Sequence, residues 1–380
     1  LAATLLPSAP PVPGGSVATR PVVLLPPTPA ASATGLATTL TNANNINRTL
    51  TLTGANSGDN IFAAALSNPG TGKLGITKTG AGRWILSGTT KSNTGLIDVQ
   101  AGTLGFKNSL PPSFAPTVDA AATLSLDTVS VEGSPALNIA GTLEIAGPVN
   151  VALADNPAPG TYTLLQYGAL AGGGTLTAPY RTYSIGTPDS TSTALTVGAG
   201  SALTWTGATS NDWDVNGALN WQNASAGAEK FYWLDSVTFD STGSLYPSVV
   251  LTQNVRPNQI TVNEALVDYS FSGTGSITGT GSLVKSGAAT LTISNANSFT
   301  GGISLNAGTI KAGGNQSLGG NGQVITVASG ATLNTNGSLN ANRDYAATIA
   351  GAGTDGNGAI VNTGADHQSG GAQVRPDGRL

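Results

Sequence analysis

The sequence predicts an all-β chain that coils into a β-solenoid, and three observations carry this prediction. Short runs alternate apolar and polar residues, glycines punctuate the ends of these runs, and one pattern of runs occurs twice. The chain contains 52 glycines among 380 residues, and 9% of its residues are charged, against about a quarter in typical soluble domains. Glycine supplies the positive φ angles that tight corners need, so this composition favours turn-rich β-structure.

The repeated pattern has one copy at residues 73–104 and a second at residues 283–310. Within the copies, Leu291–Ser294 matches Trp84–Ser87, and glycines fall at matching corners. A single short run cannot bury its apolar face alone, so two copies in the same order indicate coils that stack on one another. No stretch of the chain shows a convincing helical period.

Residues 1–35 form a Pro-rich segment that we expect to be extended, because proline lacks the N–H that a central strand donates. Within it, Val22, Val23, Leu24 and Leu25 make an apolar run that a plain linker does not need. Two interpretations stay open. The segment is either a linker, or an arm in which this run adds a strand to a neighbouring subunit.

The remaining residues divide into three predicted segments. Residues 36–200 form a first β-solenoid segment, and residues 251–380 form a second one. Between them, residues 201–250 differ in composition, because they contain all but one of the tryptophans of the chain. We interpret this stretch as a junction or a local elaboration of the solenoid. Its tryptophans are Trp205, Trp213, Trp221 and Trp233.

The stretch Asp212–Gly217 has the first half of a calcium-loop pattern. Alternating oxygen ligands on Asp212, Asp214 and Asn216, followed by a glycine, suit a tight turn around a hard cation. The twelfth position of such a loop holds Asn223 here, where the pattern requires a bidentate glutamate. A polar turn is the favoured interpretation. Calcium is the alternative, and it is the only cofactor that the sequence suggests.

The tryptophan-rich stretch also has two interpretations. The flat rings of Trp213, Trp221 and Trp233 would suit the stacking of a glycan. Alternatively, the rings are buried, where each removes a large apolar area from water. Packing is the favoured interpretation, and we expect Trp84 and Trp205 in the core because they fall within strand patterns.

Few residues of this sequence are candidates for a catalytic role. His367 is the only histidine, and its Gly-rich polar surroundings indicate a solvated loop. Two carboxylate pairs, Asp235 with Asp240 and Asp212 with Asp214, have the residue types of a glycosidase. Aspartate at a turn also accepts hydrogen bonds from its own backbone, and we expect that role here. We therefore predict no enzymatic activity and assign no catalytic residue.

Charge and hydropathy exclude several partners. The net charge is −4 and the basic residues are scattered, so the basic stripe of a nucleic-acid-binding face is missing. No run approaches the ~18 apolar residues of a membrane-spanning helix, and we predict no membrane span. The chain contains no cysteine and no methionine, so we expect a processed chain without disulfides.

The pattern K-x-G-x-G-x-W-x-L-S-G, followed by T-G-x-x-x-V-x-A-G-T-L, resembles the autotransporter-associated β-strand repeat. That repeat occurs in passenger regions of bacterial autotransporters and in large surface proteins of Gram-negative bacteria. The second copy departs from it at Ala289 and Asn295, where the first has Gly82 and Gly88. The resemblance implies a right-handed parallel β-helix that lies outside the cell or on the outer surface of a bacterium. In the first copy it rests on Lys78, Gly80, Gly82, Trp84, Leu86, Ser87, Gly88, Gly95, Val99, Ala101, Gly102, Thr103 and Leu104.

These observations favour a secreted structural protein. A solenoid presents unpaired strand edges at its ends, and such edges pair with another chain unless they are capped. We predict a subunit that stacks head to tail on copies of itself into an extracellular fibre or surface layer, with residues 1–35 docking on the neighbour. An adhesin or autotransporter passenger fragment that binds glycans or cell surfaces is the first alternative. A polysaccharide-acting enzyme is the second. No β-barrel translocator follows the pattern, so we expect it to be cleaved or replaced by another export route.

Overall fold

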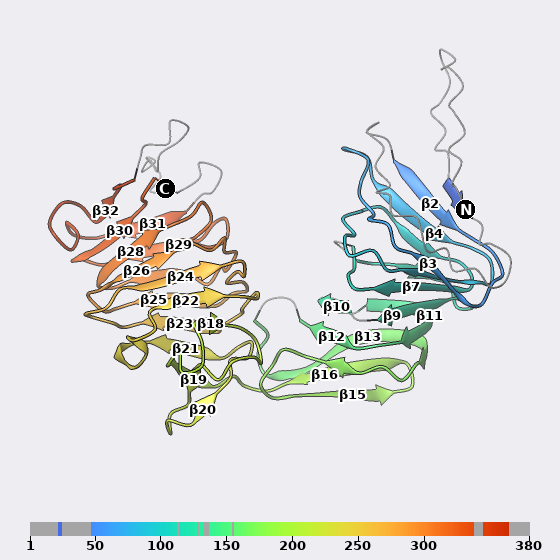
Figure 1. The fold of residues 1–380 in the computed structure, drawn as a ribbon, viewed down its shortest axis with the longest axis horizontal. Coiled ribbons are helices and arrows are strands. Elements are labelled where there is room, and N and C mark those ends of the chain that lie inside the picture. The colour runs from blue at the N-terminus through green and yellow to red at the C-terminus, as the bar shows by residue number, and fades with distance from the viewer. Residues whose placement is uncertain are drawn as a thin grey trace, which may run out of the picture. The chain divides into compact units, whose positions relative to one another are not determined.

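The computed structural model describes residues 22–24, 47–111, 114–127, 129–132, 137–153, 156–337 and 345–364. Within these residues the chain is all-β, and its one helical element is a single 3-10 turn, η1 (Ser241–Gly243). The strands run mostly parallel and stack coil upon coil (Figure 1). The predicted β-solenoid is therefore confirmed. Its right-handed sense stays a prediction.

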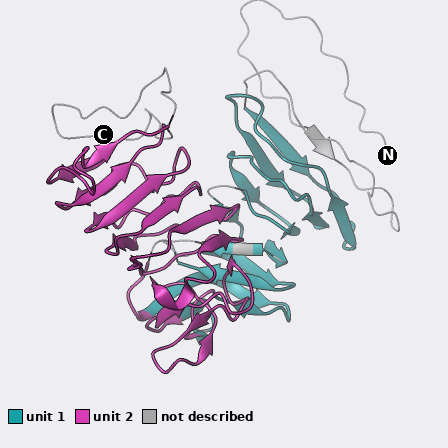
Figure 2. Cartoon of the chain, turned by 60° about the vertical axis from the view of Figure 1, so that its left-hand side comes forward, with its two compact units in different colours: residues 1–153, 161–178, 184–195 teal, residues 154–160, 179–183, 196–380 magenta. Residues whose placement is uncertain are grey.

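The chain divides into two compact units (Figure 2). Unit 1 comprises residues 1–153, 161–178 and 184–195, and unit 2 comprises residues 154–160, 179–183 and 196–380. Each unit is thus built from separate stretches of the chain. The predicted roles of the four sequence segments stay predictions. No helix in the described parts of either unit is long and apolar enough to cross a membrane.

Unit 1 contains three sheets. The first has the order β1 (Val22–Leu24), β2 (Arg48–Leu52), β4 (Leu74–Lys78), β6 (Ile97–Val99) and β8 (Thr117–Val118). The second has the order β15 (Tyr183–Asp189), β16 (Ser192–Val197), β13 (Gly160–Ala171), β11 (Leu137–Ile145), β9 (Thr123–Asp127), β7 (Thr103–Lys107), β5 (Arg83–Leu86) and β3 (Asp59–Phe62). The third has the order β10 (Val129–Glu132), β12 (Val149–Ala152) and β14 (Leu176–Thr177).

Unit 2 contains two sheets. The nine-stranded sheet has the order β20 (Ala228–Glu229), β19 (Trp221–Gln222), β17 (Ala202–Trp205), β21 (Ser236–Phe239), β23 (Gln259–Val262), β25 (Ser282–Lys285), β27 (Ile303–Leu305), β29 (Val324–Val327) and β31 (Ala346–Ile349). The seven-stranded sheet has the order β18 (Asp212–Trp213), β22 (Ser248–Leu251), β24 (Tyr269–Gly273), β26 (Thr290–Ile293), β28 (Gly308–Ala312), β30 (Ala331–Asn334) and β32 (Ile360–Val361).

Each copy of the internal repeat forms two stacked coils. In the first copy, Ile76 of β4 pairs with Ile97 of β6, and Trp84 of β5 pairs with Leu104 of β7. In the second copy, β25 pairs with β27 and β26 with β28 in the same parallel manner. Each copy is therefore a stacking unit in itself, because the coil formed by its first half packs directly on the coil formed by its second half.

The core of unit 2 is a stack of apolar side chains in register. Ile260, Leu283, Ile303 and Ile325 occupy successive strands of the nine-stranded sheet at the same position, and all four are buried. Full burial of an aliphatic side chain contributes about 1.5–3 kcal/mol, so each added coil extends a core that one coil cannot build.

The nine-stranded sheet of unit 2 changes from parallel to antiparallel pairing at the edge formed by β19 and β20. β17 pairs parallel with β21, but it pairs antiparallel with β19, which in turn pairs antiparallel with β20. An edge closed by a short antiparallel ribbon is less open to pairing with another chain than a long parallel edge.

Part of the predicted N-terminal arm lies in unit 1. Val22–Leu24 forms β1 and pairs parallel with β2 of the same chain, with Val22 opposite Leu50 and Leu24 opposite Leu52. Leu25 and the rest of residues 1–35 lie outside the described residues, and so does His367. Docking of the arm on a neighbouring subunit stays a prediction.

Candidate functional site

Three tryptophans of residues 201–250 meet inside unit 2. Trp205 on β17, Trp213 on β18 and Trp221 on β19 have exposed fractions of 0%, 0% and 1%. The ring centroids of Trp205 and Trp221 lie 5.0 Å apart, and those of Trp213 and Trp221 lie 5.4 Å apart. Edge-to-face pairs of this kind stabilise a core beyond the area that they bury.

This burial corrects the prediction of a glycan platform at Trp213 and Trp221. A sugar needs an open ring face, but strand alternation turns both rings inward against Phe231 and Phe239. The favoured interpretation from the sequence, packing at a junction, describes these two residues.

Trp233 differs from the others because it is only partly buried. The guanidinium of Arg256 lies 4.1 Å from the centroid of its ring, within cation–π range, and Tyr180 meets it edge-on at 6.2 Å. Its Nε1–H donates to the carbonyl oxygen of Asn254 at 3.3 Å. One ring face is thus covered by Arg256, and glycan stacking on the other face stays a prediction.

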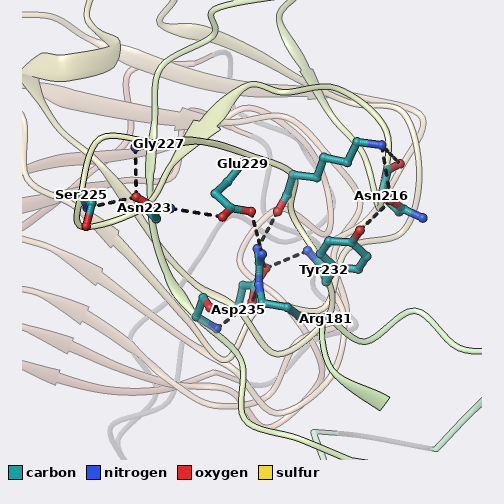
Figure 3. Close-up of polar contacts among 10 residues, drawn as sticks. Arg181, Asn216, Asn223, Ser225, Gly227, Glu229, Tyr232 and Asp235 are labelled. Carbon is teal, nitrogen blue, oxygen red and sulfur yellow. Dashed lines mark hydrogen bonds and ion pairs between the residues drawn. The ribbon is translucent and has the colours of Figure 1, made fainter. Parts of the chain in front are cut away.

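The predicted calcium loop is a hydrogen-bonded turn. Both carboxylate oxygens of Asp214 accept from the backbone N–H of Ala218, at 2.9 and 3.1 Å. The side-chain oxygen of Asn216 accepts from the hydroxyl of Tyr232 at 2.7 Å, and its carbonyl oxygen accepts from the ammonium of Lys230 at 3.2 Å (Figure 3). The oxygens of Asn216 are therefore already engaged by protein donors.

Asp212 lies on β18 and contributes to strand pairing, with its N–H accepted by the hydroxyl oxygen of Ser210 at 3.1 Å. In the described parts of the chain, no group of three or more His, Cys, Asp or Glu side chains is placed to hold a metal ion. The geometry favours the polar turn over a calcium site at Asp212, Asp214 and Asn216.

Asp235 is the centre of a polar network that the sequence does not reveal. Its side chain is fully buried, and Arg181 donates to it from Nε at 3.0 Å and from Nη2 at 2.8 Å (Figure 3). The backbone N–H groups of Ser201 and Tyr232 donate to the same carboxylate, each at 2.8 Å. A buried carboxylate is stable only when its charge is paired and its oxygens are hydrogen-bonded, and both conditions hold here.

Arg181 is held as firmly as its partner. It also donates to Glu229 at 2.8 Å and to the carbonyl oxygen of Lys230 at 2.6 Å, and it lies 5.1 Å from the centroid of the Tyr232 ring. The hydrogen bonds with Asp235 raise the pKa of Arg181 further above its usual range. No motif surrounds Arg181 in the sequence, and only the fold brings residues 179–183 against residues 229–235.

Asp235 and Asp240, one of the two carboxylate pairs that suggested a glycosidase, have structural roles. Asp235 is occupied by Arg181, and Asp240 accepts from the backbone N–H of Thr242 at 2.9 Å, which caps η1. The carbonyl oxygen of Asp240 also accepts a hydrogen bond from the hydroxyl of Tyr269 at 2.8 Å. These contacts are those of turn-forming aspartates, as the sequence suggested.

Both repeat copies contain a buried lysine at the same position. The ammonium of Lys78 donates to the carbonyl oxygens of Thr79 and Gly80, each at 2.7 Å, and to that of Ala101 on the next coil at 2.9 Å. Lys285 donates in the same way to Gly287 and to Ala307, the latter at 3.5 Å. The repeat lysine is therefore a clamp that joins the corners of two coils.

Burial lowers the pKa of these clamping lysines. The pKa falls to about 8 for Lys78 and to about 8 for Lys285. A third buried lysine, Lys91, has its pKa lowered to about 8 by the same cause, and its ammonium donates to the carbonyl oxygen of Lys107 at 2.9 Å. Removing an ammonium from water disfavours its charged form.

The repeat matches a known family model. Residues 76–105 and 283–312 match the family model described as passenger-associated-transport-repeat. The first stretch runs from within β4 to within β7, and the second runs from within β25 to the end of β28. The chain thus contains two copies of a passenger-type repeat, which confirms the resemblance that the sequence suggested.

The chain is also similar to a protein named adhesin BmaC autotransporter from Brucella suis biovar 1 (strain 1330). The two are 31% identical over 107 residues, which is 28% of this chain and 3% of the relative. The chain thus spans a small part of the length of that relative. No solved structure matches the chain. The repeat and the relative both point to an extracellular or cell-surface location.

Proposed function

We propose that this chain is an adhesive passenger segment, in which the β-coils of each unit present their outward faces to surfaces outside the cell. The observation that supports this most is the passenger-type repeat in both units, formed by strands whose inward faces build the core of stacked coils. The similarity to an adhesin supports it further. The chain needs no catalytic group for this role, and the carboxylates that the sequence offered are engaged in turns and ion pairs.

Adhesion is tested with the full chain coupled to micrometre-sized beads at one density. The beads are settled on epithelial cell layers and on bare glass, and detachment is measured under increasing shear. An adhesive segment retains more beads than an albumin coating at every shear. Equal detachment from both coatings on all surfaces would remove the proposal.

A fibre subunit is the second candidate, and one observation favours it. Val22–Leu24 adds a parallel strand to the edge of the first sheet of unit 1, and the same pairing from another copy would link two chains. Electron microscopy of the concentrated full chain, beside a variant with Val22→Pro, Val23→Pro and Leu24→Pro, tests this. Fibres that form only without the prolines would support it, and monomers in both samples would exclude it.

A further inference from the structure

The outward face of the nine-stranded sheet carries a line of small side chains, one from each of its parallel strands β21, β23, β25, β27, β29 and β31. We call this line the outer ladder. On β21 to β29, the residue before each ladder position is buried, so the ladder side chains point away from the core. The pairing register places its members directly opposite one another. They are Thr238, Thr261, Val284, Ser304, Thr326 and Thr348.

The hydroxyl groups of the outer ladder are available to a ligand. Among the described residues, none of the five hydroxyls has a hydrogen-bond partner. A second row, two positions earlier on the strands, runs beside the ladder and includes Ser236, Gln259 and Ser282. In that row the amide of Gln259 donates to the hydroxyl of Ser282 at 3.5 Å. The second row is polar on β21 to β25 and becomes apolar at Val324 and Ala346, so the ladder is the row that offers hydroxyls along most of the sheet.

The face carries neither charge nor aromatic rings along both rows. The seven-stranded sheet has Lys311 in its corresponding row, and the second sheet of unit 1 has Asp59 paired with Arg83. A polyanion or an anionic membrane requires basic groups, and sugar stacking requires open rings. Recognition on the outer ladder therefore depends on hydrogen bonds to an uncharged partner.

We propose that the outer ladder binds a neutral, extended polysaccharide that lies along the axis of the solenoid. This inference rests on the adhesive function and names its ligand. Successive rungs are ~4.8 Å apart, as neighbouring strands are, and one sugar unit of an extended chain has a similar length. A linear glycan would therefore meet one rung per sugar, and five of the six rungs offer a hydroxyl to its own hydroxyl groups.

The ladder also predicts how affinity depends on ligand length. One hydroxyl–hydroxyl contact contributes little in water, because each partner gives up a hydrogen bond to solvent. A chain that spans all rungs makes the later contacts intramolecular, which raises the affinity without any new kind of contact. Binding is expected to rise steeply between two and about six sugars and then to level off, because the ladder has six rungs.

The test measures binding of the full chain to hydroxyethylcellulose, glucomannan and arabinoxylan, with anionic polygalacturonate for comparison. A ladder variant carries Thr238→Val, Thr261→Val and Thr326→Val, which remove hydroxyls but keep the shape and the strand preference of threonine. A matched control carries Thr290→Val, Thr292→Val and Thr309→Val on the outward face of the seven-stranded sheet. Circular dichroism confirms that both variants are folded.

The expected result is binding to at least one neutral polymer that falls tenfold or more in the ladder variant and less than twofold in the control. A single change, Thr261→Lys, is expected to weaken binding to the neutral polymer as well, since it places a strongly hydrated charge on the second rung. Equal loss in the ladder and control variants, or preferential binding to polygalacturonate, would overturn the inference.

The outcomes also separate this inference from adhesion itself. Beads that adhere equally with wild-type and ladder-variant chains would leave the adhesive function standing and remove the outer ladder as its site. Polysaccharide binding without bead adhesion would leave the outer ladder standing as a binding site and remove the adhesive function. If sedimentation shows that the ladder variant loses self-association and not glycan binding, the partner is a second copy of the chain and the inference is wrong.

Discussion

At the scale of single residues, the chain buries charges where ordinary sequences place apolar groups. Asp235 and Lys78 are both fully buried, yet their environments differ. Asp235 has a cationic partner in Arg181, whereas the ammonium of Lys78 faces only carbonyl oxygens. The first arrangement compensates a buried charge with another charge, and the second does so with dipoles, so the two respond differently to substitution and to pH.

The variant Arg181→Ala should lower the free energy of unfolding of unit 2 by about 3–5 kcal/mol, because it leaves the carboxylate of Asp235 buried without its partner. Denaturant unfolding, followed by the fluorescence of the buried tryptophans, measures this loss. The control Lys107→Ala removes an ion pair with Asp127 at a more exposed position, where about 0–1 kcal/mol is expected. Similar losses in the two variants would contradict the structural role of Arg181.

The three buried lysines should make stability rise with pH. In the folded chain the pKa values of Lys78, Lys91 and Lys285 are about 8, whereas an unfolded lysine keeps a pKa of about 10.4. Below pH 8 both states hold the protons, and the full cost of burying the ammonium groups is present. Above pH 8 the folded state releases them before the unfolded state does, so the cost is relieved as pH rises.

Denaturant unfolding at pH 7.5, 8.5 and 9.5 measures this dependence. The window ends before tyrosines titrate, because burial raises the pKa of Tyr269 well above its usual range, and ionisation of this tyrosine in the unfolded state opposes the trend. The slope should be smaller in a variant with Lys78→Met, Lys91→Met and Lys285→Met. The same slope in both chains would show that other groups set the pH dependence.

At the scale of elements, the corners of the coils decide which residues the repeat tolerates. Gly102 and Gly308 occupy the same corner in the two repeat copies, with φ angles of 66° and 69°. A Cβ at Gly308 would lie 2.3 Å from the carbonyl oxygen of Gly287 on the neighbouring coil, and one at Gly102 would lie 2.4 Å from that of Gly82. Glycine is required there both for the left-handed backbone and for the close approach of the coils.

The variant Gly308→Ala should be more destabilising than Gly322→Ala. Both positions have positive φ, but a Cβ at Gly322 would meet nothing within 4 Å. Gly322→Ala therefore isolates the backbone cost of about 1–2 kcal/mol, and Gly308→Ala adds the clash between coils. Thermal unfolding of both variants gives the comparison. If their losses are equal, the close approach at the corner does not limit stacking.

At the scale of the whole molecule, unit 2 depends on chain segments that precede it. Residues 154–160 and 179–183 belong to unit 2 although strands of unit 1 lie between them. Asn156 donates to the carbonyl oxygen of Pro257 at 2.8 Å and accepts from the N–H of Thr280 at 3.1 Å. A domain boundary drawn at one point in the sequence would therefore cut unit 2.

A fragment of residues 196–380 should consequently melt below a fragment of residues 154–380. The shorter fragment lacks Arg181 and Asn156, so Asp235 and the corner at Thr280 lose their partners. Calorimetry of the two fragments measures the difference in melting temperature. The variant Arg181→Ala in the longer fragment should lower its melting temperature by much of that difference. Equal melting temperatures would show that residues 154–160 and 179–183 do not stabilise unit 2.

Much of the element-level structure was predictable from local pattern. The strands at Leu74–Lys78, Arg83–Leu86 and Thr290–Ile293 follow the period-2 alternation, and the glycine corners between them follow from the need for positive φ. The candidate sites were less predictable. Burial of Trp213 and Trp221 depends on which residues pack above and below them, and strand alternation alone does not report this.

The sequence by itself determined the coil and the kind of repeat, because alternation and glycine spacing act between residues that are close together in the chain. The tertiary structure alone decided which side chains share a face. Thr238, Thr261 and Thr326 are far apart in the chain, and the register of parallel pairing aligns them. Likewise, Arg181 meets Asp235 only once the chain has folded, since long-range contacts of this kind leave no local signal.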